Sequence, residues 1–139
     1  MEEIKVKAEL EQLDTVIRFI DEQLDKIGCG MKVQLQIEVA VEEIFVNIAH
    51  YAYPGKDGTA DIRFSFDDQA NVATICFLDS GTPYNPLARE EPDTTLSVEE
   101  RSIGGLGIFM VKKTMDNIEY EYKDGNNVLT LQKYACRSV

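Results

Sequence analysis

The chain has 139 residues, 44% of them hydrophobic and 28% charged, a composition typical of a folded globular protein and unlike that of a disordered chain. It carries 14 Lys and Arg residues against 25 Asp and Glu residues, a formal net charge of −11. A surface of this sign repels phosphate backbones and anionic lipids, which argues against nucleic acid and membranes as partners.

The length predicts a single domain over residues 1–139 with a substantial core. The first residues, MEEIKVKAEL, alternate charged and apolar side chains and lack the basic end and apolar run of a secretory signal. No apolar stretch approaches the roughly 18 residues that a membrane span needs, so we expect a cytoplasmic protein. Three cysteines lie far apart, at spacings of neither a metal site nor a redox pair, and we expect structural, reduced thiols: Cys29, Cys76 and Cys136.

The N-terminal part of the chain predicts one strand and two helices. Residues 2–8 alternate apolar and charged side chains, as a half-buried strand does, and apolar residues recur at steps of three and four over 10–27, as in a helix that ends at a Gly-Cys-Gly stop. Residues 31–52 fit both an alternating strand and a helical stripe. Because this stretch is too long for a typical strand and holds no Gly or Pro before Pro54, we predict a helix.

The remaining chain predicts two β-hairpins with a long loop and a helix between them. Residues 59–67 and 71–79 alternate on either side of a short polar turn, and the last two strands flank Asp124-Gly125-Asn126. Periodicity stops over 80–103, and loops of this length usually serve a function, for instance as a lid. Glycines at 104–107 then open a helix. The order β-α-α-β-β-loop-α-β-β predicts an α+β fold of two layers, with helices on one face of a mixed or antiparallel sheet.

The second predicted helix carries Glu43, Asn47 and His50 on one face, at the spacing i, i+4, i+7. A polar stripe opposite an apolar one is usually the solvated side of a helix. The functional alternative is a proton-accepting carboxylate beside a carboxamide oxygen, which can bind Mg²⁺ together with phosphate oxygens and water. For His50 a structural hydrogen bond and a role in a site both stay open.

Two further stretches carry chemistry. Asp79 ends an apolar strand and is followed by Gly81, a pattern that is common in turns. The functional alternative is a nucleobase site, in which the carboxylate accepts the amino hydrogen of adenine and the glycine lets the purine approach the backbone. Gly104, Gly105 and Gly107 either end the long loop or leave backbone N–H groups free at a helix N-terminus, where anions bind. They match neither the dinucleotide fingerprint nor a P-loop.

In combination these stretches are more specific than each is alone. The order E-x-x-x-N on a helix, D-x-G at a strand end, a long polar loop and G-G-x-G entering a helix resembles the GHKL superfamily of ATPases, which includes gyrase and the histidine kinases. NIAHYAYP and IGGLGIFMVKKTMD bring the chain nearest to the small bacterial anti-sigma-factor serine kinases. The resemblance covers nearly the whole chain and implies the two-layer GHKL (Bergerat) ATP-binding fold, with a flexible ATP lid over about residues 82–103.

The resemblance also implies roles for single residues. Glu43 resembles the general base, Asn47 the ligand of Mg²⁺, and Asp79 with Gly81 the adenine-binding residues. Gly104, Gly105 and Gly107 resemble the phosphate-binding hinge of the lid. Arg101, just before these glycines, is either a solvated charge of the lid or a contact to the terminal phosphate of ATP. The Gly-Thr that the family usually has before its last strand is absent, because Asn126-Asn127 stands there.

As a functional expectation, the resemblance implies an ATP- and Mg²⁺-dependent serine-protein kinase that phosphorylates a small antagonist protein of the anti-sigma-factor type and sequesters a sigma factor. It also implies a homodimer. Two alternatives remain: a nucleotide-gated protein-binding module without kinase activity, and a plain interaction domain that binds no nucleotide.

Overall fold

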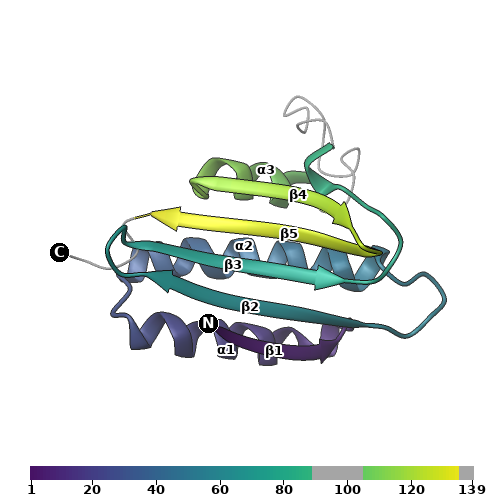
Figure 1. Cartoon of the computed structure of the whole chain (residues 1–139), viewed down its shortest axis with the longest axis horizontal. Helices are drawn as coiled ribbons and strands as arrows, with labels where there is room; N and C mark the ends of the chain where they lie inside the picture. Colours follow the sequence, from purple (N-terminus) through teal and green to yellow (C-terminus); the bar gives the residue numbers. More distant parts are fainter. Residues whose placement is uncertain (89–104, 135–139) are drawn as a thin grey trace.

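The computed structural model describes residues 1–88 and 105–134, and it has a five-stranded sheet with three helices on one of its faces (Figure 1). The strands follow the order β1-β2-β3-β5-β4, and every neighbouring pair is antiparallel. Their bounds are β1 Glu2–Lys7, β2 Thr59–Asp67, β3 Val72–Asp79, β4 Asn117–Lys123 and β5 Asn126–Tyr134. The expected two-layer α+β fold is confirmed, and its sheet is antiparallel rather than mixed.

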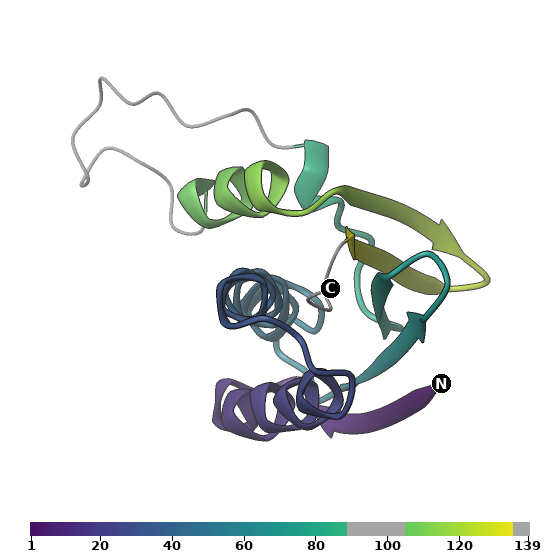
Figure 2. The same cartoon turned by 90° about the vertical axis from the view of Figure 1, so that its left-hand side faces the viewer.

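The helices form the second layer, with α2 in the middle, α1 on one side of it and α3 on the other (Figure 2). Their bounds are α1 Leu13–Lys26, α2 Met31–Tyr51 and α3 Gly105–Thr114, and short 3-10 turns occur at Leu10–Gln12 and Pro86–Ala88. Within the described parts of the chain, no helix has the length and apolar character that a membrane span requires.

Burial along α2 settles the ambiguity of residues 31–52. The apolar side chains that face the core follow the helical period: Ile37, Val41, Ile44, Phe45 and Ile48. Leu35 and Val39, which would have lined the buried side of a strand, are 55% and 52% exposed. The core between the layers is completed by alternating residues of the strands, such as Ile62, Ile75, Phe77 and Leu131.

The turns have the conformations that their residues favour. Asp124 and Gly125 both have positive φ, 54° and 79°, as the two-residue hairpin turn between β4 and β5 requires. At the β2–β3 turn the Asp67 carboxylate accepts hydrogen bonds from the backbone N–H groups of Gln69 (3.0 Å) and Ala70 (3.1 Å). These local contacts fix the register of both hairpins.

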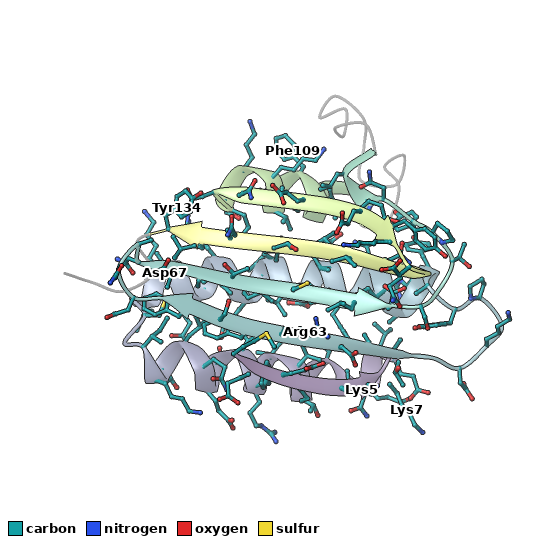
Figure 3. The ribbon with its side chains drawn as sticks, viewed as in Figure 1. Lys5, Lys7, Arg63, Asp67, Phe109 and Tyr134 are labelled. Carbon is teal, nitrogen blue, oxygen red and sulfur yellow. The ribbon has the colours of Figure 1, made fainter. Side chains whose placement is uncertain are left out.

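On the face of the sheet away from the helices, oppositely charged residues of β1 and β2 stand directly across from each other. Lys5 pairs with Asp61 and Arg63 with Glu3, at 3.8 and 3.4 Å, and Lys5 and Arg63 are labelled in Figure 3. Cys76 of β3 also lies on this face, and neither Cys29 nor Cys76 forms a disulfide with another described residue. Cys136 lies outside the described residues.

Candidate functional site

Asn47 and Glu43 lie one turn apart on α2 and are hydrogen-bonded to each other. Nδ2 of Asn47 donates to the backbone carbonyl of Glu43 (2.9 Å) and to Oε1 of its carboxylate (3.1 Å). Both N–H bonds of the Asn47 Nδ2 group are directed at Glu43, so Oδ1 of Asn47 points elsewhere. No hydrogen bond from a described residue reaches this oxygen. Asn47 is only 6% exposed. A carboxamide oxygen with open lone pairs is a ligand type that Mg²⁺ accepts, so this residue fits the metal.

The Glu43 carboxylate lies against the first turn of α3. A Cβ atom built on Gly107 would overlap this carboxylate, so only glycine allows so close an approach. The N–H groups of the first turn of α3, which starts at Gly105, have no acceptor within the helix and form its positive end. Two stretches that are distant in the sequence thus place a carboxylate beside a helix N-terminus, the kind of helix end at which anions can bind.

Asp79 ends β3 at the same end of the molecule and is 6% exposed. Its Oδ1 accepts hydrogen bonds from the backbone N–H of Gly81 (3.0 Å) and from Nδ2 of Asn127 (2.8 Å). Burial raises the pKa of Asp79 above its ordinary value, and the hydrogen bonds from Asn127 and Gly81 oppose that rise because they favour the ionised form. The side chain is therefore a desolvated acceptor at a strand end.

Asn127, which in the sequence is only a departure from the family pattern, makes four side-chain hydrogen bonds to described residues. It stands directly across from Asp79 in the pairing of β3 with β5. Besides Asp79, its Nδ2 donates to the carbonyl of Thr82 (3.0 Å), and its Oδ1 accepts from the backbone N–H of Tyr84 (3.1 Å) and from the hydroxyl of Tyr120. Nothing local in the sequence indicates this role, because it depends on strand register.

A cavity opens between α2 and the sheet and is bordered by Asn47, Asp79 and Asn127. Its apolar walls come from Ile44, Ile48, Ala52, Phe77, Pro86 and Leu129, and its polar groups from Asn47, Asp79, Thr82, Tyr84, Tyr120 and Asn127. An apolar slot with a few convergent polar groups is the usual form of a small-molecule site. The cavity volume is about 30 Å³, and a water molecule needs roughly 10–15 Å³ by this measure, so the slot holds about two waters.

A purine is larger than two waters, so one wall has to move outward when such a ligand enters. The walls on α2 and the strands belong to the close-packed core, whereas Thr82, Tyr84 and Pro86 lie on the connection that follows β3. The Tyr84 ring packs on the Tyr51 ring with centroids 5.1 Å apart, and Nζ of Lys112 on α3 donates to the carbonyl of Leu87 (3.2 Å). Residues 82–88 thus supply the part of the cavity wall that lies outside α2 and the sheet.

The other predicted site residues are placed as follows. A Cβ atom on Gly81 would overlap the carbonyl oxygen of Ala52, so this glycine is needed for packing against the end of α2, and the Thr82 N–H donates to the same oxygen at 2.7 Å. His50 is exposed, and its ring meets the Tyr51 ring edge-on at 5.9 Å, away from Asn47, which is turned inward. Gly104 and Arg101 lie outside the described residues, as does most of the expected lid.

The fold and this site define a class of nucleotide-binding protein, and comparison with known families agrees. The histidine kinase-like ATPase domain family matches residues 6–133, so the chain belongs to this family. Among curated proteins it is similar to the serine-protein kinase RsbW of Bacillus pumilus (25% identity, 91% of this chain, 81% of the relative) and of Bacillus thuringiensis (26% identity, 97% and 85%).

A solved structure supports the fold. The crystal structure of the RsbU and RsbW domains of Rv1364c from Mycobacterium tuberculosis superposes with a TM-score of 0.65 at 15% identity. The superposition covers all of this chain and 35% of that longer protein. At this identity the likeness bears on the fold alone.

Proposed function

We propose that this protein is an ATP-dependent serine-protein kinase of the anti-sigma-factor type, which phosphorylates a small antagonist protein and sequesters a sigma factor. The observation that carries the proposal is convergence: Glu43 and Asn47 on α2, the glycine-rich start of α3, and Asp79 on β3 surround one end of the fold. The similarity to serine-protein kinases named RsbW adds support for the reaction class.

Different residues bind different parts of the nucleotide. Asp79 accepts the amino hydrogen of adenine, the apolar slot takes the purine faces, and the N–H groups at the start of α3 bind phosphate oxygens. Asn47 offers Oδ1 to Mg²⁺, which neutralises charge on the phosphates when it is bound. The hydrogen bond from Asn47 to Glu43 keeps the carboxylate close to this point.

Glu43 is then the general base. It takes the proton of a serine hydroxyl while the serine oxygen forms a bond to the γ-phosphorus of ATP and the bond to the β-phosphate oxygen breaks, which leaves phosphoserine and ADP. Most of the rate enhancement comes from positioning and charge neutralisation, because phosphoryl transfer needs little covalent work by the protein. Arg101 and Gly104 are further candidates for contact with the phosphates.

Transfer of radiolabelled γ-phosphate to a purified antagonist-type protein tests the proposal. The parent should label the substrate on serine, and Glu43→Gln should lower the rate by roughly 10²–10⁴ while ATP affinity changes little. Glu42→Gln, which removes the same charge from the neighbouring exposed position on α2, is the matched control and should retain activity. Labelling that survives Glu43→Gln would remove Glu43 from the role of base.

The nucleotide-gated binding module gives a different result in the same set of proteins. In that case ATP changes the affinity for the partner equally in the parent and in Glu43→Gln, and no phosphoserine forms. A plain interaction domain would show neither effect. The three readouts therefore separate the three functions.

A further inference from the structure

We propose that Asn127 determines which atom of Asp79 meets the nucleobase, and that it thereby makes the site select a purine with an amino group at C6 over one with an oxo group. This inference deepens the proposed function, because it rests on nucleotide binding in the cavity. It concerns a residue outside the motifs that mark the site in the sequence.

The orientation of the Asn127 carboxamide is fixed by three of its four partners. Two acceptors, Oδ1 of Asp79 and the carbonyl of Thr82, face one end of the amide, and a backbone N–H donor from Tyr84 faces the other. A flipped amide would set its oxygen against the two acceptors and its NH₂ group against the donor. The bond to Asp79 joins cross-strand partners in the sheet, so it persists when residues 82–86 move to admit a ligand.

This arrangement divides the two oxygens of Asp79 between protein and ligand. Both of its hydrogen bonds, from Asn127 and from the backbone N–H of Gly81, fall on Oδ1. No hydrogen bond from a described residue reaches Oδ2, and Asp79 lines the cavity. An ionised carboxylate only accepts hydrogen bonds, so Oδ2 pairs with a C6 amino group and opposes a C6 oxygen.

The preference depends on the charge of Asp79. A proton on this carboxyl group belongs on Oδ2, because Oδ1 already faces two donors, and Oδ2 then becomes a donor that suits a C6 oxygen. Burial raises the pKa of Asp79 and the Asn127 hydrogen bond lowers it, so loss of Asn127 moves protonation to higher pH.

The other charged or titratable groups around Asp79 are few. Tyr84 and Tyr120 line the cavity together with Asp79, and the three residues that α2 contributes to the cavity wall are uncharged. On the far side of the sheet, Lys5, Asp61 and Arg63 line a separate hollow that Asp79 also borders. All of these stay in place in the variants below, so they do not produce a difference between variants.

Calorimetric titration with ATP and with inosine triphosphate, which carries an oxo group at C6, tests the inference between pH 5.5 and 8.5. The parent should prefer ATP by roughly tenfold or more at pH 8, and less at pH 5.5, since an unmade buried hydrogen bond costs about 1.4 kcal/mol. In Asp79→Asn the carboxamide oxygen takes the Oδ1 position and its NH₂ group the Oδ2 position. This variant should therefore prefer inosine triphosphate, independently of pH.

Variants at residue 127 test the control exerted by Asn127. In Asn127→Leu, the preference for ATP over inosine triphosphate should fall at pH 7, and the pH at which this preference is half lost should move upward. Asn127→Thr, whose hydroxyl can donate one hydrogen bond, should recover part of the preference. Asn126→Thr is the matched control, because Asn126 bonds to the Asp124 carbonyl on the turn rather than to Asp79, and it should behave as the parent. Thermal unfolding of each variant without nucleotide reports whether it is folded.

Different outcomes would refute this inference and the proposed function on which it rests. A parent that binds neither nucleotide overturns the proposed function. If the parent binds ATP but Asp79→Asn keeps the same ATP preference, or folded Asn127 variants keep the parental preference at every pH, the inference is wrong while the function stands. If the Asn127 variants do not fold, the reversal in Asp79→Asn still decides whether the orientation of residue 79 sets the selectivity.

Discussion

At the scale of single residues, Gly107 controls the position of the carboxylate that we propose as the base. The absence of a side chain at this position is what lets Glu43 lie against α3, and the Asn47 amide holds it there from the other side. The end of a Glu side chain is flexible, so a methyl group at 107 displaces the carboxylate more readily than it displaces the helix.

We therefore expect Gly107→Ala to separate stability from catalysis. Alanine favours a helix over glycine by up to about 1 kcal/mol, which offsets the displacement of Glu43, so the free energy of unfolding should stay within about 1 kcal/mol of that of the parent. Phosphate transfer should fall by roughly a hundredfold or more. Urea unfolding and a transfer assay measure the two effects. Thr114→Ala, at the other end of α3, is the control, and equal activity in Gly107→Ala and the parent would refute the role of this contact.

At the scale of elements, the packing of α1 on α2 brings acidic side chains together away from the site. Glu38 of α2 hydrogen-bonds to Asp21 of α1, and Asp21 also accepts a hydrogen bond from Gln34 (3.3 Å). The bond to Asp21, then desolvation and the charges of Asp21 and Asp25, raise the pKa of Glu38 from 4.5 to about 7. Glu38 therefore keeps a proton in the folded protein up to about neutral pH.

This pair predicts a pH dependence of stability. The pKa of Glu38 is higher in the folded than in the unfolded chain, so the folded state binds more protons between about pH 4.5 and 7. The contribution of this group to the free energy of unfolding is largest below pH 4.5 and is lost as the pH rises to 7. Glu38→Gln should weaken that dependence and stabilise the protein relative to the parent at pH 8.

Urea unfolding of the parent and the variant at pH 5 and pH 8 measures this difference. Glu42→Gln removes the same charge from an exposed position one turn further along α2, so it should keep the parental difference between the two pH values. If Glu38→Gln also keeps that difference, the acidic pair does not control stability.

At the scale of the whole molecule, the proposed ligand would connect both layers. It would touch α2 and the start of α3 in the helical layer and the end of β3 and the start of β5 in the sheet, around a cavity with room for only about two waters. A ligand that binds only the folded chain stabilises it by mass action, by roughly 2.7 kcal/mol at a concentration 100 times its dissociation constant.

We expect Mg²⁺ and ATP together to raise the thermal midpoint of the parent by several degrees. Asn47→Ala removes the Mg²⁺ ligand, so its smaller rise should not depend on the metal, and Asp79→Asn should show no rise with ATP. Titration with and without EDTA measures these differences. If millimolar nucleotide and Mg²⁺ leave the thermal midpoint of the parent unchanged, the protein is a plain interaction domain that binds no nucleotide.

The elements could be predicted because their signals lie within short windows. The alternation of β3, the three- and four-residue steps of α1 and the Asp-Gly turn at 124–125 are properties of neighbouring residues, and all three match the structure. Residues 31–52 were ambiguous because their apolar positions fit two periods. Only packing against the sheet, which buries Ile37 and Val41 and leaves Leu35 exposed, decides between the two.

Local periodicity and motif spacing predict the α+β class, the order of the elements and the stretches that carry Glu43, Asn47 and Asp79. Only the folded chain brings Asn127 across from Asp79 and Gly107 against Glu43, and leaves His50 exposed while Asn47 is buried. The physical reason is that strand register and helix packing join residues far apart in the chain. Their contacts depend on the entire core, which no short window contains.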